Sequence, residues 1–598
     1  MRNHLFLWKL CFKAAPRYMI FFIYDAFRYQ FIIFLEHTLG IGYVLYCAEH
    51  GEPFYKAAIG IGLVLLINII QIVPDGYFIH GMTYRSKPKL YEALTEKMYE
   101  KAAQLDLSCY DDPKYYNDLV LAVSEATSSI DRFLKMLNSS VQSITTIVTT
   151  GIFFLLTDAV GILFVLASFI LSFLFSKAIN KLKLEIRMKV NPWERKRNYA
   201  SRVFYLNDYA KELRLNKEVG KILKEDFTEA NEQIEIEQRK ISRKRVTLQF
   251  LRYYCAGDFI TDGLYVGYLI IQAAVFHRID YSSAVVLFNR TGSLRSAMRG
   301  IAEIGPQINE NNLFLEKIMK FLSYEPELKH NIGANVPMTT GKIEMQHVSF
   351  RYTDESPEIL HDINMVVNPG ERIAIVGYNG AGKTTLIKLL MRLYDPTEGC
   401  VLYHDKNVKE YNLDEYHSRI GVVFQDYRMF GENLLENVVL DDPRNMEHID
   451  DSVSGQETKV IDALDRSGFR ERLESLPKGL DTPITTEFDE KGVNLSGGES
   501  QKVAIARAFF RDADILAMDE PSSALDPIAE YNLNKAMHEA AENKTVFYIS
   551  HRLSTTRDAD RIIMLEHGKI IEEGTHDELL QANGKYSEMW NAQAGRYL

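Results

Sequence analysis

A short glycine-rich segment carries the most specific chemistry in the sequence, and it reads Gly377-Tyr-Asn379-Gly380-Ala-Gly382-Lys383-Thr384-Thr385. The spacing G-x-x-x-x-G-K-T is typical of a loop that binds phosphate. Its glycines let successive backbone N–H groups point inward at anionic oxygens. We expect Lys383 to reach the β- and γ-phosphates and the Thr384 hydroxyl to ligate Mg²⁺. The segment therefore predicts a nucleoside triphosphate site.

Regular elements on both sides of this loop must hold it in place. The apolar run 373–376 precedes the loop and predicts a strand, and the amphipathic stretch 386–393 predicts a helix after it. The N-terminus of such a helix adds unpaired N–H groups and a favourable dipole to the phosphate site. A glycine-rich turn without chemical meaning does not require both elements, so the phosphate-binding interpretation is favoured.

Three further apolar runs in the second half end in polar side chains. They are 420–424 before Gln425, 515–518 before Asp519 and Glu520, and 546–549 before Ser550 and His551. Apolar strands that alternate with helices predict an α/β domain with a mainly parallel sheet. Near the end, 562–565 and 569–572 predict a hairpin. The segment from Thr575 to Glu578 predicts a helix-capping box.

The first half contains long apolar runs, namely 29–48, 57–73, 144–176, 258–276 and 281–302. A break at Thr157 and Asp158 divides the third run, so the pattern predicts six membrane-spanning helices in three hairpins. The turns of the hairpins are short and poor in Lys and Arg, whereas the segments between hairpins are long and charged. This asymmetry predicts that the long segments and both termini lie in the cytoplasm. Buried helices of a soluble protein are the less suitable alternative.

The charged segments 80–138 and 177–250 show helical spacing. Leu90, Leu94 and Met98 recur every four residues, which predicts that the second span continues as a helix beyond the membrane. Interruptions near 111–116 and 213–218 predict places where these helices turn back. Ordinary surface turns remain the alternative for both interruptions.

Length and composition limit the remaining possibilities. A chain of 598 residues is too long for one core, and a formal net charge of -11 does not favour a nucleic-acid partner. Five scattered cysteines show no metal-ligand spacing and predict no disulfide framework. The N-terminus lacks the pattern of a cleaved signal peptide. We predict an all-α membrane domain over 1–325, a linker over 326–341 and an α/β nucleotide-binding domain over 342–598.

The order of the motifs resembles the ATP-binding cassette (ABC) family. The matching residues are Tyr352, the phosphate loop, Gln425, Leu495-Ser496-Gly497-Gly498, Asp519-Glu520 and His551. Six predicted spans ahead of one cassette are similar to the half-transporters of the exporter-type fold, also called type IV. The resemblance covers essentially the whole chain and implies ATP as the nucleotide.

The resemblance implies a role for each matching residue. Tyr352 would stack on adenine, and Gln425 would contact Mg²⁺ and the attacking water. Asp519 would hold Mg²⁺, and Glu520 would act as the general base. His551 would contact the γ-phosphate. The implied nucleotide site also contains Gly377, Asn379, Gly380, Gly382, Lys383, Thr384 and Thr385, among which Lys383 also serves catalysis and Thr384 the metal.

The resemblance also implies a dimer. In the family, the loop that contains Ser496 and Gly498 faces the γ-phosphate bound to another cassette, so two half-transporter chains must pair. The segment 523–526 matches the loop that crosses this interface. Two departures from the family pattern, Glu499 for glutamine and Lys502 for arginine, lie beside the phosphate contacts. A homodimer and a heterodimer are both compatible with the sequence.

We therefore predict an ATP-driven exporter in the cell membrane that switches between inward- and outward-facing states. The segments 111–116 and 213–218 are candidate coupling helices, and Glu490 matches the acidic residue that contacts them in the family. An importer on the same fold and a nucleotide-gated channel or regulator are the alternatives. A soluble cassette ATPase that acts on DNA or ribosomes does not fit the six spans. Peptide, lipid and amphipathic drug remain open as cargo.

Charges within the predicted spans are candidates for the translocation cavity. Arg290 and Glu36 lie about ten residues, or roughly 15 Å at helical rise, from the outer turns, and Asp262 lies deeper. Intramembrane charges normally face a bundle interior or a wet cavity because exposure to lipid is costly. We predict that at least one of the three lines the cavity, with structural pairing between helices as the alternative.

Overall fold

The computed structural model describes residues 2–328, 332–353, 355–440, 453–511, 513–521, 531, 535, 539, 544–549 and 553–594. The chain forms two compact units. The first comprises Met1–Ala103 and Asn117–Tyr324, and the second comprises Gln104–Tyr116 and Glu325–Leu598. The division between the units assigns the short segment 104–116 to the second unit.

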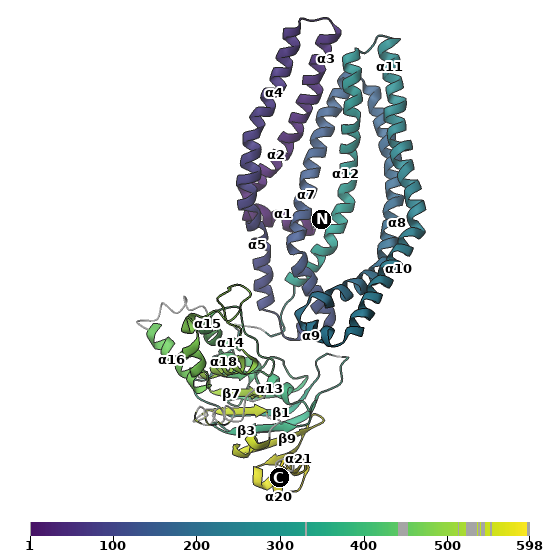
Figure 1. Ribbon diagram of the computed structural model, residues 1–598. Coiled ribbons are helices and arrows are strands. Elements are labelled where there is room, and N and C mark those ends of the chain that lie inside the picture. Colours follow the sequence, from purple (N-terminus) through teal and green to yellow (C-terminus); the bar gives the residue numbers. More distant parts are fainter. Residues whose placement is uncertain are drawn as a thin grey trace. The chain divides into compact units, whose positions relative to one another are not determined.

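The first unit is built from helices (Figure 1). Its first part contains α1 (Arg2–Ala14), α2 (Pro16–Phe34), η1 (Leu35–Gly40), α3 (Ile41–Glu49), α4 (Phe54–Gly76), η2 (Tyr77–Thr83) and α5 (Tyr84–Ala103). Its second part contains α7 (Pro113–Thr157), α8 (Ala159–Tyr205), α9 (Asn207–Leu215), α10 (Lys217–Phe250), η3 (Leu251–Tyr265), α11 (Val266–Ala274) and α12 (Tyr281–Leu322). The segments η1, η2 and η3 are π-helical, a wider coil that is rare in proteins and frequent at functional sites.

Among the described residues, four helices are long and apolar enough to cross a bilayer: Pro16–Glu49, Phe54–Ala103, Asp118–Thr157 and Ala159–Tyr205. They correspond to the first four predicted spans. The predicted spans at 258–276 and 281–302 are also helical, but they are not among these four. The composition of these two spans is more polar because η3 carries Asp258 and Asp262 and α12 carries Arg290, Arg295 and Arg299.

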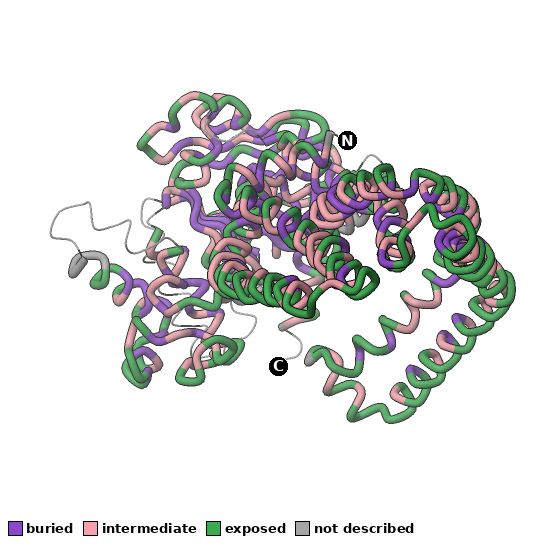
Figure 2. The backbone as a smooth tube through the Cα atoms, turned by 90° about the horizontal axis from the view of Figure 1, so that it is seen from above, coloured by how far each residue is buried: buried purple, intermediate pink, exposed green. Residues whose placement is uncertain are grey.

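Large apolar side chains are exposed on these helices. On α4, Ile69, Ile72 and Val73 are 62%, 67% and 74% exposed. The helices at the right of Figure 2 are likewise exposed along much of their length. A helix that shows apolar residues on its outer face suits lipid rather than water, because in a soluble protein that face packs into the core. This pattern agrees with the predicted bilayer environment.

Carboxylates fix the ends of two hairpins. Asp158 lies between α7 and α8 and accepts a 3.3 Å bond from the backbone N–H of Val160, which confirms the predicted break there. Glu49, at the end of α3, accepts bonds of 2.8 and 2.9 Å from the backbone N–H groups of Tyr281 and Ser282. These two donors open α12 and have no partner within that helix.

The helix from α4 through η2 to α5 is continuous, which confirms that the second span extends as a helix. Leu90, Leu94 and Met98 on α5 are buried, as their spacing predicts. The predicted turn at 111–116 is displaced, because a short helix, α6 (Ser108–Asp111), precedes it and α7 begins at Pro113. The predicted turn at 213–218 coincides with the end of α9 and the start of α10.

The second unit contains two sheets. One is antiparallel, in the order β2-β1-β4-β5, with β1 (Ile343–Phe350), β2 (Leu360–Val367), β4 (Glu398–Tyr403) and β5 (Lys406–Asn407). The other has the order β10-β9-β3-β8-β7-β6, with β3 (Arg372–Gly377), β6 (Ile420–Val423), β7 (Ile515–Asp519), β8 (Thr545–Ile549), β9 (Arg561–Glu566) and β10 (Lys569–Gly574). Its pairs are parallel except for the hairpin of β9 and β10. The predicted mainly parallel sheet and the predicted hairpin are confirmed.

The central strand β3 lies between two hydrophobic cores. Ala374 and Val376 belong to the core that includes helix α18, and Ile373 and Ile375 belong to the core that includes helix α13. Successive side chains of a strand point to opposite faces, so a strand covered on both sides must be apolar throughout. Among the described residues, the α-helices of this unit after Glu325 are α13 (Lys383–Leu390), α14 (Leu413–Ser418), α15 (Leu434–Val439), α16 (Val453–Arg466), α17 (Arg470–Ser475), α18 (Gly497–Phe510), α20 (His576–Gln581) and α21 (Lys585–Ala594).

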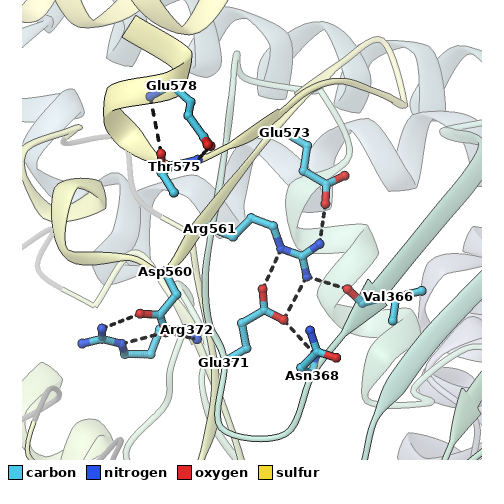
Figure 3. Close-up of polar contacts among 9 residues, drawn as sticks. All are labelled: Val366, Asn368, Glu371, Arg372, Asp560, Arg561, Glu573, Thr575 and Glu578. Atoms are coloured by element: carbon cyan, nitrogen blue, oxygen red, sulfur yellow. Dashed lines mark hydrogen bonds and ion pairs between the residues drawn. The ribbon is translucent and has the colours of Figure 1, made fainter.

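A polar network holds the start of β3 against β9 (Figure 3). Arg372 donates to Asp560 over 2.6 and 3.1 Å. Arg561 donates to both oxygens of Glu371 over 2.7 and 3.0 Å, and it also bonds to the Glu573 carboxylate. The predicted capping box is confirmed nearby, since the side chain of Thr575 and that of Glu578 each bond the backbone N–H of the other residue.

The segment 104–116 belongs to the second unit through specific contacts. The Asp106 carboxylate accepts bonds of 2.7 and 3.3 Å from the backbone N–H groups of Glu327 and Leu328. The Tyr394 hydroxyl donates to the Asp111 carboxylate, and Leu107 packs against the core on the α13 side of the sheet.

Candidate functional site

The phosphate loop connects β3 to α13, as predicted. Gly377, Gly380 and Gly382 have φ angles of +151°, +80° and +100°. At Gly377, the last residue of β3, a Cβ atom would lie 2.2 Å from the carbonyl oxygen of Leu565, its partner on the neighbouring strand β9. Glycine is needed here both for the backbone angle and for the close approach.

The Lys383 side chain lies along its own loop. It is buried, and its ammonium donates to the carbonyls of Gly377 and Tyr378 over 2.8 and 3.2 Å. Burial lowers the pKa of this ammonium, and the nearby charges of Glu520 and Asp519 oppose the shift. The loop therefore holds a cation beside its backbone N–H groups, which is the combination that a polyphosphate requires.

Thr384 and Asp519 come together at the start of α13. The Thr384 hydroxyl donates a 2.7 Å hydrogen bond to the Asp519 carboxylate. In the described residues there is no group of three or more His, Cys, Asp or Glu side chains placed to hold a metal. A hydroxyl beside one carboxylate nevertheless fits Mg²⁺, which commonly takes one or two protein ligands and completes its shell with water and substrate phosphates.

Gln425 and Glu520 face each other across neighbouring strand ends. The Gln425 amide donates to Glu520 over 3.1 Å, and the Gln501 amide donates to the backbone carbonyl of Glu520 over 3.2 Å. Glu520 has a φ angle of +51°, and its N–H bonds to the Ile549 carbonyl at 3.0 Å. Non-glycine residues rarely adopt this angle, and such strain concentrates at functional sites.

These side chains surround one cavity of about 570 Å³. Its lining residues are Ile359, Asn379, Gly380, Ala381, Gly382, Lys383, Thr384, Thr385, Gln425 and Glu520. Residues that are far apart in the sequence meet here because β3, β8, β7 and β6 are parallel neighbours whose C-terminal ends lie at one edge of the sheet. The cavity thus combines phosphate donors, the Thr384 hydroxyl that is bonded to Asp519, and a carboxylate paired with an amide.

Tyr352 lies next to this cavity, although the described residues that line it do not include Tyr352. Its hydroxyl is 3.1 Å from the Thr385 hydroxyl, and the Lys388 ammonium lies 5.4 Å from its ring centre. Phe350 and Tyr394 pack edge-on against the ring at 5.0 and 5.3 Å. Adenine stacking by Tyr352 stays a prediction.

The segment around Ser496 forms the start of α18. Ser496 and Glu499 make a reciprocal capping box over 2.7 and 3.3 Å. Burial raises the pKa of the Glu499 carboxyl, but the bonds from Ser496 and the charges of Arg472 and Lys502 together lower it below its ordinary value. Ser496 is exposed, and neither Ser496 nor Gly498 is among the described residues that line the cavity. Their predicted role requires a second cassette.

Several predicted residues were not tested by this geometry. His551 and the segment 523–526 lie outside the described residues. Glu490 is exposed. In the first unit, Arg290 is 4% exposed and donates a 3.5 Å bond to the Thr150 hydroxyl, whereas Glu36 is half-buried and Asp262 is exposed.

The sequence interpretation missed three side chains that support the site. Gln501 holds the backbone of Glu520, Tyr427 donates a 2.8 Å bond to the Gly497 carbonyl, and Arg472 pairs with Glu499 at 2.9 Å. Gln501 stands within the α18 motif, so its position was a usable signal. Tyr427 and Arg472 belong to no motif and are brought in by tertiary packing.

Comparison with known proteins gives consistent matches. Residues 360–523 match the family model described as ABC transporter. The chain is 30% identical over 498 residues to the subtilin transport ATP-binding protein SpaT of Bacillus subtilis, covering 83% of this chain and 79% of the relative. It is 37% identical over 318 residues, 53% of this chain, to the ATP-dependent lipid A-core flippase of Coxiella burnetii.

In some relatives the matched part is shorter. It spans about half of their length, 51% of that flippase and 54% of YgaD of Bacillus subtilis. Among solved structures, a bacterial Atm1-family ABC exporter with ATP bound superposes with a TM-score of 0.76 at 21% identity. This match covers 97% of this chain and 99% of the other, so the two share one fold over nearly their whole length.

Proposed function

Because this chain belongs to the ABC transporter family, we propose that it is an ATP-driven exporter that works as a pair of chains in the cell membrane. The observation that carries the proposal is the cavity in which Gln425 and Glu520 face the phosphate loop. The same chain carries helices long and apolar enough to cross a bilayer. Similar proteins named as a transport protein and a flippase favour movement of an amphipathic cargo.

Each side chain of the cavity supports one part of ATP hydrolysis. Lys383 and the loop N–H groups bind and orient the β- and γ-phosphates. Thr384 and Asp519 would hold Mg²⁺, which would neutralise charge that develops on the phosphates. Gln425 orients the attacking water, and the Glu520 carboxylate accepts its proton. In this scheme His551 contacts the γ-phosphate, as the family resemblance implies.

A second chain completes the site in this proposal. Ser496 and Gly498 of one chain donate to the γ-phosphate held by the other, since both lie at an exposed helix N-terminus. ATP bound at both interfaces closes the cassettes, and hydrolysis reopens them. The cassettes and both termini face the cytoplasm, and the cavity between membrane helices alternates between the two sides.

Replacement of the proposed base tests this function. In proteoliposomes, Glu520→Gln is expected to lower ATP hydrolysis by about two orders of magnitude while ATP still binds. The transport assay uses a lipid, peptide or drug that stimulates ATP hydrolysis by the wild-type protein. Its transport is expected to decrease together with hydrolysis in the variant. Glu398→Gln, at an exposed position of β4, is the matched control and retains both activities. Near-normal hydrolysis in Glu520→Gln contradicts the assignment of the base.

A further inference from the structure

A second cavity, of about 450 Å³, lies within the first unit between α8, η3 and α12. Five basic residues and one acidic residue line it, namely Lys177, Lys183, Arg252, Arg295, Arg299 and Glu303. The lining residues of α8 recur at three- and four-residue intervals, and Arg295, Arg299 and Glu303 follow one another at intervals of four on α12. Such spacing places each set on one face of its helix.

In the part of the chain that the structure describes, Arg295 is the only one of these five cations that pairs with a carboxylate. Arg295 is held by Thr261 at 2.7 Å and by Asp258 at 3.5 Å. Arg252 donates a 3.4 Å bond to the neutral Ser176 hydroxyl, and Arg252 and Arg299 both lie over the ring of Tyr253, at 4.7 and 5.5 Å. Like charges gathered in a site of low dielectric repel one another, so an anion in the cavity stabilises the arrangement.

Buried polar atoms in the same place lack partners. Within the described part of the chain, the Nε atom of Arg252 and the hydroxyl of Ser172 are buried and make no hydrogen bond. Ser172 is 6% exposed and lines the cavity. A buried donor without an acceptor is costly, and an oxyanion supplies several acceptors at once.

One wall of the cavity is apolar. Phe169 and Phe173 line it with their rings 6.1 Å apart, followed by Ala302 and Pro306. Lys177 lies about 18 residues from the first residue of α8, or about 27 Å at helical rise. That length is close to the thickness of the hydrocarbon core, so the basic residues sit at one boundary of the membrane.

We propose that this cavity binds an amphiphile with a phosphate headgroup. The headgroup contacts Arg252, Arg299 and Lys177, and the apolar chain runs along Phe169 and Phe173. This assignment rests on the proposed export function, for which it names the substrate class: anionic amphiphiles taken up at one membrane boundary.

Cations at the end of a span are also common as general anchors for lipid headgroups. Two features distinguish this cavity from such an anchor. Its cations come from three separate helical segments, and Arg295 is only 19% exposed. A general anchor would not distinguish one headgroup geometry from another.

Direct binding without nucleotide tests the assignment. Calorimetric titration of the purified full chain is expected to show dihexanoyl phosphatidic acid binding at least about tenfold more tightly than dihexanoyl phosphatidylcholine. Glycerol 3-phosphate, which has the headgroup alone, is expected to bind at least about tenfold more weakly than the phosphatidic acid. Equal affinity for the two lipids overturns the proposal. Glycerol 3-phosphate binding as tightly as the lipid also overturns it, in favour of a soluble phosphate site.

Variants locate the binding. Arg252→Gln combined with Arg299→Gln is expected to reduce phosphatidic acid affinity at least about tenfold. Lys177→Gln with Lys183→Gln replaces exposed residues, preserves the fold and is expected to reduce affinity at least threefold. Arg214→Gln with Arg278→Gln, both exposed and outside the cavity, is the control. A loss in the control as large as in the cavity variants contradicts the site. These affinities are measured without ATP, so they do not depend on whether the protein exports a substrate. A negative binding result and a negative export result can therefore be told apart.

Discussion

At Gly377 the chain has no room for a side chain. Gly377 ends β3 beside Leu565 of the neighbouring strand β9, and a Cβ atom would lie 2.2 Å from the Leu565 carbonyl oxygen. A flexible neighbour could move away, but a backbone carbonyl within a buried strand cannot do so without disturbing the sheet. The cavity geometry therefore depends on this single position.

We expect Gly377→Ala to reduce ATP affinity at least about tenfold and to lower the melting temperature. Gly370→Ala is the control, because Gly370 also has a positive φ, +78°, but a methyl group added there would have nothing within 4 Å. Its cost is backbone strain alone, about 1 kcal/mol. Fluorescent ATP binding and thermal unfolding of both variants check this. A Gly377→Ala protein that binds ATP as the Gly370→Ala protein does would contradict the close approach.

The same scale shows which site residues the sequence can predict. Thr384 and Asp519 were expected to share a metal, and their side-chain oxygens lie 2.7 Å apart. Their pairing follows from strand ends that meet at one edge of a parallel sheet, so a motif after each strand is sufficient. Tyr427 and Arg472 could not be predicted, because their partners come from tertiary packing rather than from any local pattern.

At the scale of elements, a helix or strand can be predicted when its apolar residues form a clear pattern in the sequence. The run 373–376 was identified as a strand because both faces of β3 are buried and every residue is apolar. Helix α1 was missed. Its buried residues Leu7, Leu10 and Cys11 lie on one face, but the basic residues between and around them interrupt the apolar pattern in the sequence. The π-helical segments were also missed. Their sequences show the same apolar pattern as an α-helix, and only the backbone hydrogen bonds differ, since they join residues five apart instead of four.

Arg561 offers a test at this scale. Its guanidinium joins Glu371, Glu573 and the Val366 carbonyl, and thereby holds β9 to the start of β3 and to β10 (Figure 3). We expect Arg561→Met to destabilise the protein by about 1–3 kcal/mol, because it removes the cation that pairs with the partly buried Glu371 carboxylate.

Arg470→Met is the control for this prediction. Arg470 pairs with Glu474 four residues away and is 50% exposed, so its loss is expected to change the melting temperature much less than Arg561→Met does. Thermal unfolding followed by fluorescence compares the two variants with the wild-type chain. Equal melting temperatures in both variants would show that the network does not hold the strands.

At the scale of the whole molecule, the proposed hydrolytic site is divided between two chains. The cavity contains Lys383, Gln425 and Glu520, whereas Ser496 lies at an exposed helix N-terminus outside it. The sequence predicted this division only through the family resemblance. No spacing within one chain can reveal which surface a second chain covers.

Complementation between chains tests the proposed pairing. A heterodimer of one Lys383→Ala chain and one Ser496→Arg chain retains one intact site, formed by Lys383 of the second chain and Ser496 of the first. We expect it to recover ATP hydrolysis, to about half of the wild-type rate if the sites act independently. A heterodimer of a wild-type chain with the double variant has no intact site and is expected to be inactive. Two tags isolate each heterodimer, and hydrolysis by a strictly monomeric preparation would contradict the pairing.

The contacts of the segment 104–116 limit how this chain can be recombined with its relatives. Asp106 binds the backbone at Glu327 and Leu328, and Asp111 accepts from Tyr394. A chimera that exchanges only the residues after Tyr324 would replace Glu327, Leu328 and Tyr394. It would keep the original Asp106 and Asp111, which bind them. The exchangeable module is therefore discontinuous in sequence, and a chimera inherits a matched pair only when 104–116 travels with 325–598.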